Sequence, residues 1–212
     1  MFTETIAGCT LSFETDHTVF SPGKIDFGTR AMLSEAGFQT GDKVLDLGCG
    51  YGAAGILAAQ KIGAENVVMC DVLPEAIALS KQNAVRNNVE AIEIIRSDAF
   101  DEIAACDFTL ILSNPPYHTD FSVAKRFIEG GFRHLVTGGR MLMVTKRLEW
   151  YKNKLTSVFG GVKIKEIDGY YVFTAEKRSA RLPGKAKKMP HLSKKLERAR
   201  KNEKNVVKER NR

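Results

Sequence analysis

The hydrophobic positions of this chain fall in short runs that alternate with amphipathic stretches between about residues 43 and 146. Because brief apolar runs are typical of buried strands, we predict strands over residues 44–47, 66–70, 91–96, 108–113 and 140–146. Apolar spacing of the helical kind lies between them and predicts helices over residues 53–61, 74–87 and 122–135. The alternation indicates right-handed β-α-β crossovers, and therefore a parallel sheet with helices on both faces.

The pattern changes on both sides of this region. Residues 163–167 and 170–175 are two β-rich runs separated by Asp168-Gly169, a pair typical of hairpin turns. An antiparallel hairpin at one edge brings the expected sheet to seven strands, and Gly138-Gly139 predict a turn before the fifth. Toward the N-terminus we predict short extended segments over residues 10–20, a turn at 21–23 and a helix over 26–36.

Charge divides the chain into two parts. Residues 177–212 hold 15 Lys and Arg against three Glu, a local balance of +12 within a whole-chain charge of +7. Residues 1–176 therefore carry −5. We predict one globular domain over residues 1–176 and a basic C-terminal tail over 177–212, which is either a polar helix or disordered. Such asymmetry favours a polyanionic partner, the alternative being a tail that is merely solvated.

The sequence also bears on compartment and on metal binding. It contains no apolar run near the roughly 20 residues that span a bilayer, and its first residues do not resemble a signal peptide. Cys9, Cys49, Cys70 and Cys106 are widely scattered and show no C-x-x-C spacing. This usage fits neither a zinc site nor a disulfide framework. We predict a cytoplasmic protein that binds neither membrane nor metal.

A glycine-rich loop follows the first of the predicted parallel strands. Asp46 precedes it, and Gly48, Gly50 and Gly52 alternate with other residues along it. Glycines let a backbone turn tightly and let a ligand approach the main chain. Dinucleotide-binding enzymes use a similar loop, but a carboxylate here would repel a pyrophosphate. We therefore favour a cationic aminoacyl sulfonium ligand over a phosphate or a turn without a ligand.

Two more carboxylates follow the next two predicted strands. Asp71 lies about 20 residues beyond the glycine loop, where a carboxylate can accept hydrogen bonds from both hydroxyls of a ribose. Asp98 comes after the third strand and is placed to accept from the amino group of an adenine. An aspartate after a strand is also a common helix cap, which is the alternative role for Asp71, whereas the alternative for Asp98 is to cap a loop.

The motif with the most specific chemistry is Asn114-Pro115-Pro116-Tyr117, after the fourth strand. Two consecutive prolines favour a rigid extended turn, which would hold nearby oxygens in place. The Asn114 side-chain oxygen and the Pro115 carbonyl can accept both N–H groups of a planar amine and aim its lone pair at a methyl group. Tyr117 can stack on the planar acceptor. Direct in-line transfer then depends on positioning, without a metal or a covalent nucleophile.

In this order the motifs resemble those of the class I S-adenosylmethionine-dependent methyltransferases. Within that class the chain is similar to the small methyltransferase domain group, which includes the 16S ribosomal RNA guanine-N2 methyltransferases. The resemblance runs from about residue 20 to residue 175 and also rests on Phe20-Ser21-x-x-Lys24-Ile25-Asp26-Phe27-Gly28-Thr29 and Gly169-Tyr170-Tyr171. It implies a Rossmann-like α/β fold, with the seven-stranded, mostly parallel sheet and the C-terminal antiparallel hairpin expected above.

The resemblance further implies S-adenosyl-L-methionine as cofactor. It places residues 26–29 beside the cofactor, Gly48 and Gly50 at its amino-acid portion, Asp71 at the ribose and Asp98 at the adenine. The residues expected at the cofactor are therefore Asp26, Gly28, Thr29, Asp46, Gly48, Cys49, Gly50, Gly52, Asp71, Val72, Asp98, Ala99 and Asn114. Those expected at the reacting amine are Asn114, Pro115, Pro116 and Tyr117.

The activity that the resemblance implies is N-methylation of RNA, above all at guanine N2 of ribosomal RNA, with the basic tail on the phosphates. Adenine-N6 methyltransferases of nucleic acids and glutamine-N5 methyltransferases of release factors carry a similar Asn-Pro-Pro-Tyr signature. Because the motif recognises only a planar amine or amide, these acceptors stay open. A non-catalytic RNA-binding protein is a third possibility. Larger members of the group carry a preceding duplicated domain, and several lack such a tail.

Overall fold

A single seven-stranded sheet forms the centre of the computed structural model, which describes residues 1–16, 23–116 and 121–180. Its strand order is β5-β4-β3-β6-β7-β9-β8, in which the first five strands run parallel and the last two pair antiparallel. The strands are β3 (Val44–Leu47), β4 (Val67–Asp71), β5 (Glu93–Arg96), β6 (Phe108–Ser113), β7 (Leu135–Thr145), β8 (Lys163–Ile167) and β9 (Tyr170–Glu176). The predicted fold class is confirmed.

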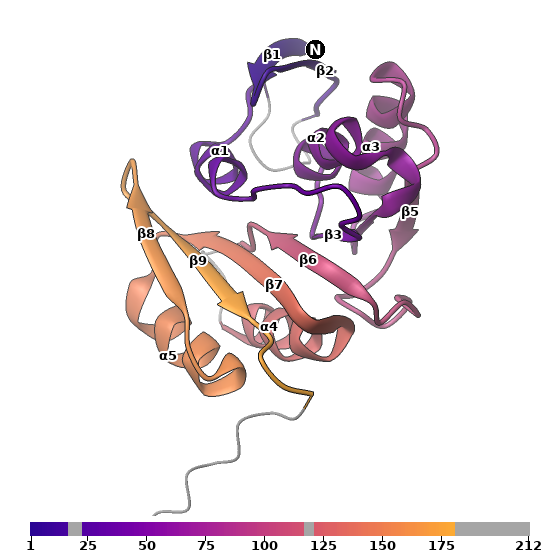
Figure 1. Cartoon of the computed structure of the whole chain (residues 1–212). Helices are drawn as coiled ribbons and strands as arrows, with labels where there is room; N and C mark the ends of the chain where they lie inside the picture. The colour runs from indigo at the N-terminus through magenta and orange to yellow at the C-terminus, as the bar shows by residue number, and fades with distance from the viewer. Residues whose placement is uncertain (17–22, 117–120, 181–212) are drawn as a thin grey trace, which may run out of the picture. The chain divides into compact units, whose positions relative to one another are not determined.

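Helices cover both faces of this sheet (Figure 1). Buried side chains of α1 (Phe27–Ser34), α2 (Ala53–Ile62) and α3 (Pro74–Arg86) belong to one hydrophobic cluster, which also includes residues of the hairpin β1 (Phe2–Ile6) and β2 (Cys9–Phe13). Those of α4 (Ser122–His134) and α5 (Leu148–Phe159) belong to a second cluster. A short 3-10 turn, η1 (Ala64–Asn66), leads into β4. The sheet is therefore buried on both sides.

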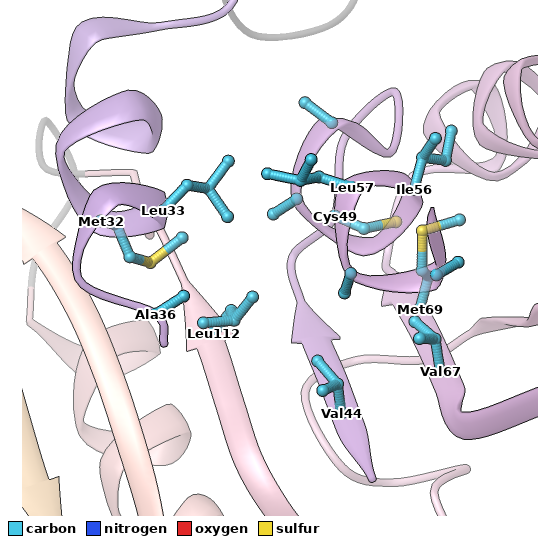
Figure 2. Close-up of a cluster of buried hydrophobic side chains, with 14 of the residues drawn as sticks. Met32, Leu33, Ala36, Val44, Cys49, Ile56, Leu57, Val67, Met69 and Leu112 are labelled. Carbon is cyan, nitrogen blue, oxygen red and sulfur yellow. The ribbon is translucent and has the colours of Figure 1, made fainter. Parts of the chain in front are cut away.

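Strand β3 shows how the sequence divides between these two clusters. Val44 packs in the first cluster, whereas Leu45 and Leu47 pack in the second, because alternate side chains of a strand point to opposite faces. In Figure 2, Met32 and Leu33 of α1 lie toward Leu57 of α2. Asp46 shares the side of Val44, so β3 places a carboxylate inside the layer between the sheet and α2.

One local prediction was wrong, and two elements were not predicted. The turn expected at Gly138-Gly139 lies inside β7, which begins at Leu135, directly after α4. There the register of β7 on β6 shifts, and Gly138 and Gly139 exchange backbone hydrogen bonds of 2.7 and 2.9 Å with Lys177. Pairing with a residue far along the chain thus keeps the two glycines in the strand. Our assignments also left out β1 and α5.

The remaining elements agree with the expected ones to within a few residues. Asp168 and Gly169, both at positive φ, form the turn of the β8–β9 hairpin as predicted. Residues 17–20 of the expected extended segments and 21–22 of the expected turn lie outside the described residues, as do Tyr117 and residues 181–212. Within residues 1–16, 23–116 and 121–180, each helix is too short or too polar to cross a membrane.

Candidate active site

The carboxyl ends of the central strands border a cavity of about 360 Å³. Cavities of this size accommodate small organic ligands, and open α/β sheets bind their ligands at this edge. The cavity is lined by Asp26, Thr29, Met32, Asp46, Leu47, Gly48, Cys49, Gly50, Tyr51, Ala53, Ala54, Cys70, Asp71, Val72, Leu73, Ala76, Ser97, Asp98, Ala99, Asn114, Pro115, Pro116, Val123 and Phe127.

Most of the residues proposed from the sequence therefore lie around one space. Gly28 and Gly52 do not line it, and Tyr117 lies outside the described residues. Gly52 is the N-cap of α2 at φ +95°, and a Cβ there would meet side-chain atoms of Ile56 and Ser80 at 3.1 and 3.3 Å. Its place in the fold is the tight entry into the helix.

The glycine loop between β3 and α2 is held by the end of β4. The N–H groups of Gly48 and Cys49 both donate to the Cys70 carbonyl, each at 2.9 Å. Gly48 and Gly50 have φ values of +76° and +56°, in the left-handed region that glycine enters without strain. A Cβ on Gly50 would meet nothing within 4 Å, so its requirement for glycine comes from backbone conformation.

Both carboxylate oxygens of Asp71 accept backbone hydrogen bonds, one from this loop and one from the segment after β4. Oδ2 accepts from the Gly50 N–H at 2.9 Å, and Oδ1 accepts from the Leu73 N–H at 3.0 Å. Beside it, Val72 and Leu73 are 50% and 45% exposed and form an apolar surface. Asp71 thus stands at the cavity edge between a polar loop and an apolar surface, as a carboxylate that also binds a ribose would need to.

Asp46 is buried beneath the same loop. Its Oδ2 accepts from the N–H of Gly55, in the first turn of α2, at 2.8 Å. Burial raises the pKa of Asp46 to about 7; the Gly55 N–H opposes this rise and nearby Asp71 adds to it. A cationic ligand would favour its ionised form.

Burial also raises the pKa of Cys70 to about 12 and that of Cys49 well above its usual value, so neither supplies a thiolate near neutral pH.

Asp98 and Ala99 border the cavity after β5. The Asp98 carboxylate is about 60% exposed and pairs with the Arg126 guanidinium of α4 at 2.7 Å. Ala99 has φ +57°, which costs a residue with a Cβ roughly 1–2 kcal/mol. Its carbonyl accepts from the Ser97 hydroxyl at 3.0 Å, which helps to hold this conformation. Non-glycine residues in such conformations concentrate at ligand sites.

The double-proline segment follows β6 directly. Asn114 is partly buried, Pro115 is buried and Pro116 is exposed. The Asn114 amide nitrogen donates to Asp26 Oδ2 at 2.9 Å and to Thr29 Oγ1 at 3.0 Å, across more than 80 residues of sequence. The start of α1 and the end of β6 therefore meet at the cavity. The resemblance implied that both lie beside one cofactor, but not the hydrogen bonds that join them.

Sequence reasoning missed most of the apolar lining. Phe127 of α4 faces the glycine loop, since a Cβ on Gly48 would lie 3.5 Å from its ring. Met32 comes from α1 and Val123 from the first turn of α4. Such residues carry no local signal that separates them from core positions, because each occupies an ordinary apolar position of an amphipathic helix.

The open, doubly wound sheet with a cavity at its carboxyl edge places the protein in the class of Rossmann-like α/β folds. The chain belongs to the methyltransferase small domain family, whose model matches residues 10–174. Ribosomal RNA small subunit methyltransferase C of Shigella flexneri is 34% identical over 154 residues, covering 71% of this chain and 44% of that protein. YbxB of Bacillus subtilis, an uncharacterized protein, is 32% identical over 174 residues, covering 78% of this chain and 86% of its own length.

A solved structure shows the same fold. The Thermus thermophilus 16S rRNA N2 G1207 methyltransferase, in complex with AdoMet and guanosine, superposes with a TM-score of 0.74 at 27% identity. The match covers 84% of this chain and 50% of that one. The chain thus spans half or less of these two methyltransferases, while it spans most of YbxB.

Proposed function

We propose that this protein is an S-adenosylmethionine-dependent N-methyltransferase that acts on RNA, with guanine N2 of ribosomal RNA as its acceptor. The proposal depends on one observation: Asn114 and Pro115 border the same cavity as the glycine loop and the carboxylate that binds it, Asp71. A donor held by the loop and an amine held by the Asn-Pro segment would then meet inside one enclosure.

The cavity suits S-adenosylmethionine in size and in chemistry. Its volume of about 360 Å³ and mainly apolar lining fit a nucleoside with an aliphatic side chain. We infer that Gly48 and Gly50 hold the amino-acid portion above Asp46, that Asp71 holds the ribose, and that Val72 and Asp98 border the adenine. When bound, the cofactor supplies a methyl group on a positively charged sulfur.

The chain's own residues position the acceptor. The Asn114 side-chain oxygen and the Pro115 carbonyl would accept the two N–H groups of a planar amine, whose lone pair is otherwise delocalised into the ring. Holding both hydrogens turns the nitrogen lone pair toward the donor, and fixed geometry of this kind accelerates a transfer strongly. The apolar wall, which includes Phe127 and Pro115, would exclude water from the reacting atoms.

Guanine N2 is favoured over the other acceptors by the relatives. A protein with this fold at 27% identity is described as an N2 guanine methyltransferase of 16S rRNA, with guanosine bound. Two arms of one experiment separate the acceptors: nucleoside mass spectrometry of ribosomal RNA, and peptide mass spectrometry of release factors, each with and without the gene. We expect N2-methylguanosine to be lost from the small-subunit RNA of the deletion strain. Unchanged nucleosides with an unmethylated release-factor glutamine would contradict the proposal.

An assay with purified components tests catalysis directly. Small ribosomal subunits from the deletion strain should accept labelled methyl groups from S-adenosylmethionine in the presence of the protein. The Asn114→Ala variant is the matched control, since it should bind the cofactor and transfer methyl groups at least about 10²-fold more slowly. A protein that binds RNA but shows no S-adenosylmethionine binding in calorimetry would instead be a non-catalytic RNA-binding protein.

We further propose that residues 178–212 bind RNA phosphates and that the reaction takes place in the cytoplasm. Lys177 is left out, because it is only 8% exposed and its Nζ donates to the Leu135 carbonyl at 2.6 Å. Fourteen Lys and Arg and three Glu remain, a balance of +11. All four cysteines are free thiols, which agrees with a reducing compartment.

The tail can be tested in the full-length protein. Replacing Lys185, Lys187 and Lys188 by glutamine should weaken RNA binding at low salt and flatten its salt dependence. With fewer phosphate contacts, binding releases fewer counterions from the RNA. The control replaces Lys81, Lys152 and Lys163, which are exposed on the domain. Fluorescence anisotropy at several salt concentrations gives both slopes. Equal slopes for the two triple variants would contradict a role of the tail in RNA binding.

A further inference from the structure

A chain of hydrogen bonds lies behind the proposed amine-binding residue. The Asn114 amide nitrogen donates to Asp26 Oδ2 at 2.9 Å and to Thr29 Oγ1 at 3.0 Å. Asp26 Oδ2 also accepts the Thr29 N–H at 3.2 Å, as the N-cap of α1. The hydroxyl of Tyr170, the first residue of β9, donates to Asp26 Oδ1 at 3.5 Å. Three elements distant in sequence thus meet on one carboxylate.

This arrangement determines which way the Asn114 amide points. A primary amide has two donors on nitrogen and an acceptor oxygen, whereas an ionised carboxylate only accepts. Asp26 and Thr29 take the two N–H groups, so the side-chain oxygen is directed away from them. In the reversed orientation the Asn114 side-chain oxygen would face Asp26 Oδ2 at hydrogen-bond distance, with no hydrogen between the two acceptors. The Thr29 hydroxyl can donate or accept and therefore fits either orientation, whereas the Asp26 carboxylate only accepts and therefore selects one.

The packing around Asp26 is tight enough to hold it in place. A Cβ on Gly28 would lie 2.8 Å from Asp26 Oδ2 and 2.8 Å from the nearest ring carbon of Tyr170. The Lys146 ammonium lies 4.8 Å from the centroid of the same ring. Gly28 thus has a structural role although it does not line the cavity: its lack of a side chain lets the Tyr170 ring reach Asp26.

We propose that Asp26 is a positioning residue that acts through Asn114. It binds the amide nitrogen so that the amide oxygen faces the acceptor amine of the proposed reaction; Thr29 and Tyr170 support it. This inference rests on the proposed function and adds a residue to it. Without Asp26 the amide can turn and present its NH₂ group to the substrate, where a donor would meet a donor and the acceptor amine would lose its alignment.

Two variants separate this role from helix capping. Asp26→Ser keeps an N-cap oxygen for α1, but its hydroxyl is too short to reach the Asn114 amide. Asp26→Asn keeps an oxygen for both Thr29 and Asn114, while its NH₂ group can donate to the Tyr170 hydroxyl. We expect kcat to fall about 10²-fold in Asp26→Ser and to stay within about threefold in Asp26→Asn. The melting temperature and S-adenosylmethionine affinity should change little in either.

A measurement without substrate tests the amide itself. In the ¹H–¹⁵N spectrum of the full-length protein, the Asn114 side-chain amide is identified by its absence in Asn114→Asp. Its two protons should exchange slowly with water in the wild type and in Asp26→Asn, and quickly in Asp26→Ser. Unchanged exchange and kcat in Asp26→Ser would overturn the inference, as would an equal kcat loss in both variants, which would assign the effect to charge. A wild type that transfers no methyl group would refute the proposed function alone, since the exchange rates still report the amide orientation.

Discussion

The two ends of the parallel strands are built from different kinds of polar contact. At the amino ends, polar groups satisfy one another: the Lys43 N–H donates to Thr109 Oγ1 at 3.0 Å, and the Thr109 hydroxyl donates to Asp42 at 2.7 Å. The Lys43 ammonium pairs with Asp107 at 2.7 Å on the surface. These contacts join neighbouring strands and loops, and none of these four residues lines the cavity.

At the carboxyl ends, the polar groups hold backbone or each other and still border a cavity. Asp46 and Asp71 bind main-chain N–H groups, and Asn114 is bound through its nitrogen. Glycines and Ala99 adopt left-handed conformations around them. Among the described residues, the carboxyl ends of the sheet thus combine left-handed backbone, the buried Asp46 carboxylate and a cavity, whereas the polar groups named at the amino ends serve to join strands and loops.

The largest expected effect separates the two ends of strand β6. Asn114→Ala should lower methyl transfer by at least about 10²-fold, because the amine loses one of its two acceptors, with cofactor affinity kept within several-fold. Thr109→Val, at the amino end of the same strand, should cost about 1 kcal/mol of stability and leave the rate unchanged. Steady-state kinetics and calorimetry measure both. Similar rate losses in the two variants would remove the functional distinction between the edges.

The two edges should also differ in their response to pH. The folded pKa of Asp46 is about 7 against an ordinary 3.8, so between these values the native protein keeps a proton that the unfolded chain releases. Its contribution to stability therefore falls as pH rises toward 7 and levels off above it. Relative to Asp46→Asn, the wild type should lose up to about 1.4 kcal/mol per pH unit between pH 5 and 7.

Asp107→Asn is the control for this pH dependence. The hydrogen bond from Lys43 lowers the pKa of the exposed Asp107, so above pH 5 this carboxylate is ionised in both the folded and the unfolded state. Its difference from the wild type should then be constant from pH 5 to pH 8. Urea unfolding at each pH measures both variants. A constant difference for Asp46→Asn as well would contradict the raised pKa.

A smaller effect distinguishes two glycines that share the same constraint. Gly50 and Gly41 have φ values of +56° and +90°, and a Cβ on either would meet nothing within 4 Å. Substitution by alanine should therefore cost each about 1–2 kcal/mol of stability through backbone strain alone. Only Gly50→Ala should also weaken S-adenosylmethionine binding, by about tenfold, since Gly41 lies at the other edge. Equal binding by the two variants would argue against a cofactor on the glycine loop.

The smallest expected effect is at the surface ion pair of the amino edge. Lys43→Ala removes the contact with Asp107, whose side chain is 62% exposed. Exposed pairs of this kind contribute little, so stability should change by less than about 1 kcal/mol and methyl transfer should not change. Thermal unfolding at low and high salt checks this. A loss of activity would show that the amino edge influences the site.

Elements whose cause lies within a few neighbouring residues could be predicted from the sequence, whereas features set by distant contacts could not. Strand β6 was predicted over the residues it occupies, because a short, mostly apolar and β-branched or aromatic run followed by two prolines is typical of a buried strand. Helix α5 was missed although its buried Tyr151, Leu155, Val158 and Phe159 have helical spacing, since polar residues separate them. The pairing of Gly138 and Gly139 with Lys177 could not be predicted, because its cause is a contact with a distant strand.

By itself, the sequence determined the fold class and the residue types at the carboxyl edge, since strand length, glycine placement and the double proline act within a few residues. Only the tertiary structure decided which of them meet. The contact between Asp26 and Asn114 spans 88 positions, and the pairing of Asp98 with Arg126 spans 28. Such contacts depend on where the packed sheet and helices bring the chain, and no local pattern encodes that position.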